Sequence, residues 1–229
     1  MSVSAVAAAP FFKNVVLITS VLYTLNNGHP MSRSVFSHEE RFEQTKLTIS
    51  RAREKIPQCA IFFVECSDLS AEHRSYILGA VDFFFNLYDI PELRCRMFTK
   101  SKAMGEGTQT IYVMDYIFKN GIRFDNFFKI SGRYYLDNRF NYEHWDNPLI
   151  VVKEFDERKN VFTFLYKMSY KHAQEWFEFL KNNEANFQRA VGYELIYGHF
   201  VGARLSDTMI IPTMGIEGFI SPDGSHVYV

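Results

Sequence analysis

The sequence predicts an α/β protein whose mixed, mainly parallel sheet is flanked by helices in a single domain. Runs of β-branched and aromatic residues, such as 14–23 and 59–65, alternate with segments whose apolar residues recur at helical spacing. A chain of 229 residues with 47% hydrophobic content can also bury one core of ordinary domain size. Ligands of such sheets bind outside the carboxyl ends of the strands, so the residues that follow each strand are the first candidates for a site.

The first half of the chain is expected to alternate between strand and helix. Residues 14–23 (NVVLITSVLY) are typical of a central strand that is buried on both faces. A helix over residues 37–57 begins at Ser37 and Glu40, which have the spacing of a capping box. The run CAIFFVE at 59–65 then returns as the second strand.

Two more helices and a strand complete this half. Apolar spacing predicts a helix over 71–89, which Ser70 can cap, and another over 108–121. The lysine- and glycine-containing segment KSKAMGEG at 100–107 is expected to be the loop before this last helix. The strand NFFKIS at 126–131 follows directly.

The C-terminal half is expected to be less regular. Residues 148–155 and 161–168 predict an antiparallel hairpin around the charged turn DERKN, which makes the sheet mixed. One helix follows Ser169 and a second covers the apolar positions of 187–195. Residues 208–224 end the chain in short strands and turns.

Composition and missing motifs argue against several classes of function. The 25 basic and 26 acidic residues are spread along the chain, so we expect no surface for nucleic acid or an anionic membrane. Cys59, Cys66 and Cys95 lack the paired spacing of a zinc site, which favours reduced thiols in a cytoplasmic protein. The start of the chain lacks the basic region of a signal peptide, and no run is long enough for a membrane span. Motifs of P-loop NTPases, dinucleotide enzymes, zinc proteases and α/β-hydrolases are missing too.

Polar residues lie near the ends of three of the expected strands or just beyond them. In chain order they are Thr19 and Ser20, then Glu65 and Asp68, then the triplet Ser131, Gly132 and Arg133. Because the carboxyl ends of parallel strands share one edge of a sheet, these groups are expected to converge. Lys102 and Gly105 precede a predicted helix start, where free amides favour phosphate oxygens. The same segment could equally be a solvated connection.

The order of several segments resembles a known family. The segments are RFEQTKLTISRAREKIP, FVECSDLS, KSKAMGEG, FFKISGRYYLDNRFN and GIEGFISPDG. Together they resemble small glycosyltransferases of the GT-A fold, a Rossmann-like α/β fold, that carry a FKISGRYYL segment. The resemblance implies a nucleotide-sugar-binding half over 1–140 and an acceptor-binding half over 141–229. It also implies transfer of a sugar from a UDP- or GDP-type donor to a glycan or another hydroxyl acceptor.

The chain departs from this family at one motif. No Asp-x-Asp occurs, and Ser131, Gly132 and Arg133 stand where that metal-binding triplet normally follows a strand. A fixed guanidinium can stabilise a departing diphosphate as a cation does, so Arg133 is expected to take this role. Dependence on Mn²⁺ or Mg²⁺ is therefore open, and no metal ligand is assigned. Arg133 could instead pair with a surface carboxylate.

The remaining donor contacts follow from the strand ends. Thr19, Ser20, Lys102 and Gly105 are expected to contact the donor, with Gly132 admitting the pyrophosphate and Ser131 donating a hydrogen bond. Glu65 and Asp68 could accept hydrogen bonds from uracil or ribose, although Asp68 also suits a turn before Ser70.

An inverting transfer also needs a base for the acceptor hydroxyl. Glu217 is the first candidate, because Gly215 and Gly218 on either side would admit a bulky acceptor. Glu194 is the second, near the apolar face of its predicted helix. Either could be purely structural.

Other groups admit two interpretations each. An aromatic cluster could form an acceptor groove or belong to the core; it comprises Tyr134, Tyr135, Tyr142, His144 and Trp145. His199, His226 and the pair Glu154 and Asp156 are weaker candidates for a base or metal ligand. The competing function is a non-catalytic nucleotide- or glycan-binding module on the same fold. A nucleotidyltransferase would need acidic metal ligands that the sequence does not offer.

Overall fold

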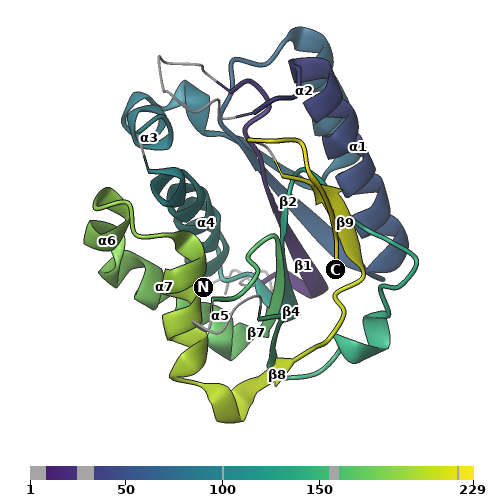
Figure 1. The fold of residues 1–229 in the computed structure, drawn as a ribbon, viewed down its shortest axis with the longest axis vertical. Helices are drawn as coiled ribbons and strands as arrows, with labels where there is room; N and C mark the ends of the chain where they lie inside the picture. The colour runs from purple at the N-terminus through teal and green to yellow at the C-terminus, as the bar shows by residue number, and fades with distance from the viewer. Residues whose placement is uncertain (1–8, 25–33, 100, 155–159, 221) are drawn as a thin grey trace, which may run out of the picture.

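A seven-stranded sheet forms the centre of the molecule (Figure 1). The computed structural model describes residues 9–24, 34–99, 101–154, 160–220 and 222–229. The strands of the sheet run in the order β3-β2-β1-β4-β7-β6-β8. Their bounds are β1 (Phe11–Thr19), β2 (Cys59–Glu65), β3 (Phe83–Asn86), β4 (Arg123–Ser131), β6 (Ile150–Val152), β7 (Leu165–Ser169) and β8 (Thr208–Ile210). A smaller sheet joins β5 (Tyr134–Leu136), β9 (Ile216–Phe219) and β10 (His226–Tyr228) in the order β10-β9-β5.

The pairing confirms a mixed, mainly parallel sheet. Strand β1 is central and pairs in parallel with β2 and β4, while β3 continues the parallel set beyond β2. Strand β7 is antiparallel to both β4 and β6, and β8 returns to a parallel pairing with β6. This geometry places the carboxyl ends of β1 and β4 side by side.

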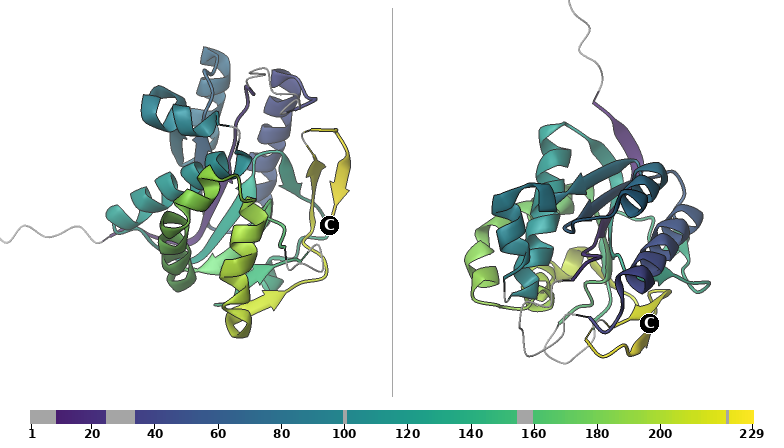
Figure 2. Two further views of the ribbon diagram at one scale, coloured as in Figure 1. Left: turned by 60° about the vertical axis from the view of Figure 1, so that its left-hand side comes forward. Right: turned by 90° about the horizontal axis from the view of Figure 1, so that it is seen from above.

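Helices cover both faces of the sheet (Figures 1 and 2). Their bounds are α1 (His38–Lys55), α2 (Ala71–Ala80), α3 (Pro91–Met97), α4 (Lys102–Lys119), α5 (Tyr170–Asn182), α6 (Glu184–Gln188) and α7 (Tyr193–Gly202). Successive residues of β1 point to opposite faces: Val15 and Leu17 pack with α3 to α7, whereas Val16 and Ile18 pack with α1, α2 and the smaller sheet. Among the described residues, no helix is both long and apolar enough to cross a membrane.

Helix α1 is confirmed, whereas the helix predicted over 71–89 is wrong beyond its first half. Ser37 and Glu40 form the expected capping box. The second helix ends at Ala80, and residues 83–86 form β3 instead. Phe83 stacks on Phe62 of β2 with ring centroids 4.1 Å apart. Pairing and ring packing against β2 therefore override the helical spacing of these aromatic residues.

The loop predicted over 100–107 is also wrong. Helix α4 already begins at Lys102, with Ser101 as its N-cap, so Gly105 lies inside the helix. A Cβ at Gly107 would lie 2.9 Å from the Phe187 ring of α6. The glycines that indicated a loop thus include one that lets two helices pack closely.

The C-terminal half follows the prediction in outline. The antiparallel pairing of β6 with β7 and the start of α5 after Ser169 are confirmed, while residues 155–159 of the turn lie outside the described residues. The single helix expected over 187–195 is divided into α6 and α7. Ala190 has a φ of 59°, a left-handed conformation that ends one helix before Gly192 caps the next.

Candidate functional site

A cavity of about 250 Å³ opens at the carboxyl ends of β1 and β4. It gathers eight of the predicted site residues: Thr19, Ser20, Lys102, Gly105, Ser131, Gly132, Arg133 and Glu194. Val21, Thr24, Arg41, Met97, Glu106 and Gln109 complete the lining. The polar groups at the ends of β1 and β4 and at the start of α4 therefore line one cavity, whereas Glu65 and Asp68 do not line it.

The two strand ends are joined directly at the cavity. Thr19 of β1 is in register with Ser131 of β4, and the Gly132 amide donates to the Thr19 carbonyl over 2.9 Å. A Cβ at Gly132 would lie 3.2 Å from both the Thr19 oxygen and Ser20 Cβ. Glycine therefore allows the turn after β4 to approach β1 closely.

Beyond Ser20, whose amide donates to the Val64 carbonyl of β2 over 2.9 Å, the chain that leaves β1 is held by side chains. The Leu22 amide donates to Glu65 Oε1 over 2.9 Å, and the Tyr23 amide donates to Ser67 Oγ over 2.8 Å. Arg41 donates from Nε to the Leu22 carbonyl over 3.0 Å, and burial lowers its pKa to about 9. Glu65 is fully buried by these contacts and does not line the cavity, so its predicted hydrogen bond to uracil or ribose is not supported.

Arg133 reaches the cavity from the turn after β4. Its Nη1 donates to the Phe219 carbonyl of β9 over 3.0 Å, and its guanidinium lies 5.6 Å from the centre of the Tyr134 ring. Burial is the main cause that lowers its pKa. Within the described part of the chain, the Arg133 side chain thus contacts a backbone carbonyl and Tyr134, and it forms no ion pair with a surface carboxylate.

An ion pair forms beside this turn, and the sequence reasoning missed it. The Lys129 side chain is fully buried and contacts the Glu106 carboxylate, which is 24% exposed and lines the cavity. A lysine inside the apolar strand FFKIS was the available signal, because a buried ammonium requires a partner. Its partner Glu106 is positioned by the first turns of α4, where the sequence predicts a loop.

Glu194 faces the same cavity from the first turn of α7. Burial raises the pKa of this half-buried carboxyl, and the negative charge of Glu106 raises it further. Two glutamates therefore share the cavity, and only Glu106 forms an ion pair with Lys129 in the described residues.

Glu217 and Asp68 are not brought into the cavity. Glu217 lies opposite Tyr135 in the smaller sheet. Burial is the main cause that raises the pKa of Tyr135 to about 12, and a hydrogen bond with the Glu217 side chain is the second cause. The neighbouring glycines do not leave space for an acceptor: a Cβ at Gly215 would lie 2.2 Å from the Phe140 nitrogen, and one at Gly218 would lie 2.5 Å from the Arg133 oxygen. They are needed for close backbone packing. Asp68 is exposed before α2.

The predicted aromatic groove is largely part of the core. Trp145 is 1% exposed and stacks on Phe140 at 5.5 Å, while Tyr134 is buried against Phe164. Tyr142 donates from its hydroxyl to the Asn14 side chain over 3.0 Å, near the start of β1. These rings pack between the sheet and the elements that cover it, which accounts for their clustering in the sequence.

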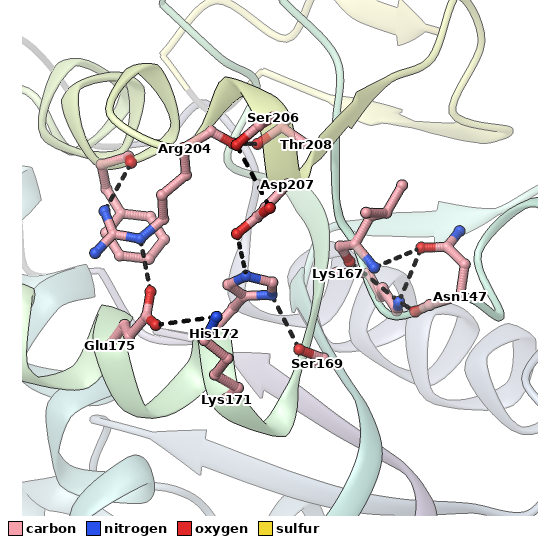
Figure 3. Close-up of polar contacts among 12 residues, drawn as sticks. Asn147, Lys167, Ser169, Lys171, His172, Glu175, Arg204, Ser206, Asp207 and Thr208 are labelled. Carbon is pink, nitrogen blue, oxygen red and sulfur yellow. Dashed lines mark hydrogen bonds and ion pairs between the residues drawn. The ribbon is translucent and has the colours of Figure 1, made fainter.

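In a separate polar cluster, a histidine contacts a serine through one ring nitrogen and an aspartate through the other (Figure 3). Ser169 Oγ lies 2.9 Å from His172 Nδ1, and His172 Nε2 lies 3.4 Å from Asp207 Oδ2. Ser169 is the N-cap of α5, and His172 is buried. These contacts join the start of α5 to the segment before β8. None of the three residues lines the cavity.

Among the described residues that line the cavity, Glu106 and Glu194 are the only acidic, histidine or cysteine side chains. Across the described residues, no three His, Cys, Asp or Glu side chains are grouped as a metal site would require. In the cavity itself, Glu106 is engaged by Lys129. His199 and His226 are exposed and outside the cavity lining.

Comparisons with known proteins give structural likeness at low identity. No family model and no curated protein matches the chain. Mouse xyloside xylosyltransferase 1 in its apo form is 8% identical, with 88% of this chain and 85% of that chain covered and a TM-score of 0.47. An active-site mutant of LgtC is 10% identical, covers 81% and 70%, and has a TM-score of 0.49. CTP:phosphocholine cytidylyltransferase from Streptococcus pneumoniae is 12% identical, covers 91% and 93%, and has a TM-score of 0.45. At these values the likenesses assign no activity to this chain.

Proposed function

We propose that this chain is a glycosyltransferase of the GT-A type. It moves a sugar from a UDP- or GDP-type nucleotide sugar to a hydroxyl group of a glycan or another acceptor. The supporting observation is that Arg133, Lys102 and Glu194 line one cavity at the carboxyl ends of β1 and β4. The two cations suit a diphosphate, and the carboxylate suits a hydroxyl group that must lose its proton.

The proposed transfer exchanges one bond at the anomeric carbon for another. The acceptor oxygen bonds to this carbon while the bond to the diphosphate oxygen breaks, and the electron pair leaves with the diphosphate. Arg133 and Lys102 stabilise the negative charge that develops there. Glu194 takes the acceptor proton, a role for which its raised pKa is suited because an effective base titrates nearer to the working pH. Its position favours it over Glu217.

Calorimetry with UDP, GDP, UDP-glucose and GDP-mannose tests the donor class, with either Mn²⁺ or EDTA present. Release of free sugar from the bound donor tests turnover, because water can replace an unidentified acceptor. Binding together with sugar release supports the proposal. Binding with neither sugar release nor transfer to any of a panel of glycans would indicate a non-catalytic nucleotide-binding module. No binding of any of these nucleotides would refute both the glycosyltransferase and the nucleotide-binding module.

A further inference from the structure

Lys129 is fully buried near the carboxyl end of β4 and contacts Glu106 and Ser131, which line the cavity. Its ammonium group donates to the Glu106 carboxylate, to Ser131 Oγ over 2.8 Å and to the Thr163 carbonyl over 2.7 Å. An ammonium group has three protons, so these partners use all of them. Lys129 can therefore act on a ligand only through the groups that it holds.

Two of these groups face the cavity. Lys129 contacts Oε1 of Glu106, which leaves Oε2 to accept a hydrogen bond from a ligand. Ser131 Oγ already accepts from Lys129, so its own proton is available for a ligand oxygen. One buried cation thus orients an acceptor from α4 and a donor from the end of β4.

The charge of Glu106 limits what can bind beside it. A carboxylate repels phosphate oxygens, whereas it accepts hydrogen bonds from neutral hydroxyl groups. Arg133 and Lys102 supply the positive charge for a diphosphate within the same cavity. The surroundings of Glu106 consequently suit the sugar better than the diphosphate.

We propose that Lys129 is a positioning residue that holds the Glu106 carboxylate oriented toward the hydroxyl groups of the donor sugar. Glu194 then remains the carboxylate that takes the acceptor proton. This inference rests on the proposed function and adds a basis for distinguishing a nucleotide sugar from the nucleotide alone.

The test compares two probes, UDP and UDP-glucose, or GDP and GDP-mannose where the wild type prefers guanine. Calorimetry of Glu106→Gln and Lys129→Met should show a loss of about 10- to 100-fold in sugar-nucleotide affinity, with the affinity for the nucleotide unchanged. Lys167→Met is the matched control. Lys167 is also fully buried, on the neighbouring strand β7, but its Nζ binds the Leu149 carbonyl over 3.2 Å, outside the cavity lining.

A double variant separates positioning from folding. Lys129→Met alone leaves the partly buried Glu106 carboxylate without its cation, so its melting temperature should fall. Adding Glu106→Gln should recover the melting temperature while sugar-nucleotide affinity stays low. Unchanged affinity ratios in the single variants, recovered sugar affinity in the double variant, or an equal loss in Lys167→Met would each overturn the proposal. A wild type that binds neither probe pair refutes the proposed function itself, and this inference with it.

Discussion

Arg133 donates a hydrogen bond to the carbonyl oxygen of Phe219, and this contact joins the turn after β4 to strand β9. A guanidinium carries five N–H groups, so the contact orients the side chain without exhausting its donors. Hydrogen bonds to a charged acceptor are about twice as strong as those to a neutral carbonyl. A diphosphate would therefore find a cation that is already in place.

Arg133→Ala should weaken donor binding and lower turnover. A charge-assisted hydrogen bond contributes roughly 1.5–3 kcal/mol, which corresponds to about a 10- to 100-fold loss of affinity. Arg123→Ala is the control, because Arg123 begins the same strand at the opposite end of the sheet. Calorimetry with the nucleotide sugar measures both variants. Unchanged binding and turnover in Arg133→Ala would show that the turn is only structural.

Glu194→Gln should bind the donor normally but transfer poorly. Loss of a general base lowers turnover by about 10²–10⁴-fold. Glu217→Gln should keep normal turnover, since Glu217 lies opposite Tyr135 in the smaller sheet. Donor affinity, turnover and melting temperature should be measured on the same samples. Loss of turnover in folded Glu217→Gln, with Glu194→Gln unaffected, would restore Glu217 as the base.

Turnover should decline on the acidic side at a higher pH than an ordinary glutamate would give. Glu194 must be ionised to accept a proton, and its pKa is raised by burial and by Glu106. Glu106→Gln removes the neighbouring negative charge, so the pKa of Glu194 should fall and the acidic limb should move to lower pH. Rates of sugar release between about pH 4 and pH 9 measure the shift. An acidic limb that does not move in a Glu106→Gln variant with measurable turnover would contradict the coupling.

Chelation by EDTA should leave most of the donor affinity intact. The groups proposed to hold the diphosphate are Arg133 and Lys102, and the cavity carboxylate Glu106 is paired with Lys129. Calorimetry and turnover should be compared in EDTA and after addition of Mn²⁺. Complete loss of turnover in EDTA with recovery in Mn²⁺ would show that a metal is required.

Two glycine substitutions should have opposite effects on stability. Gly215 has a φ of 69° and faces the backbone of Phe140, so Gly215→Ala should lower the free energy of unfolding by about 2–4 kcal/mol. Gly79 lies in α2 with no atom within 4 Å of an added Cβ, so Gly79→Ala should raise it by about 0.5–1 kcal/mol. Urea denaturation measures both. Equal stability of Gly215→Ala and the wild type would contradict the packing described for β9.

Local sequence patterns were enough to predict the sheet class and the edge that carries the cavity. The buried run of β1 and the capping box of α1 depend on neighbouring residues, and both are observed, although β1 spans Phe11–Thr19 and the prediction extended it to Tyr23. The place of Ser131 beside Thr19 follows from parallel pairing alone. Most of the donor-site prediction therefore rested on strand ends, which sequence indicates well.

Long-range packing explains the features that the sequence did not predict. Phe83 belongs to β3 because it stacks on Phe62. Residue 107 of α4 is a glycine because the Phe187 ring occupies the place of a Cβ there. The pairing of Lys129 with Glu106 depends on where α4 begins. Because the sequence predicts a loop over the first turn of α4, it does not predict this ion pair. Glu217 appeared catalytic because its flanking glycines suggested open space that other segments of the chain fill.

The segment after β1 has its backbone fixed by partners that are remote in sequence. Glu65 accepts a hydrogen bond from the Leu22 amide and Arg41 donates one to the Leu22 carbonyl, while the nearby residues Val21 and Thr24 line the cavity. The contacts that hold this backbone do not involve the side chains of Val21 and Thr24. Exchanges at Val21 and Thr24 offer a route by which evolution or an engineer can alter ligand preference while the scaffold stays the same.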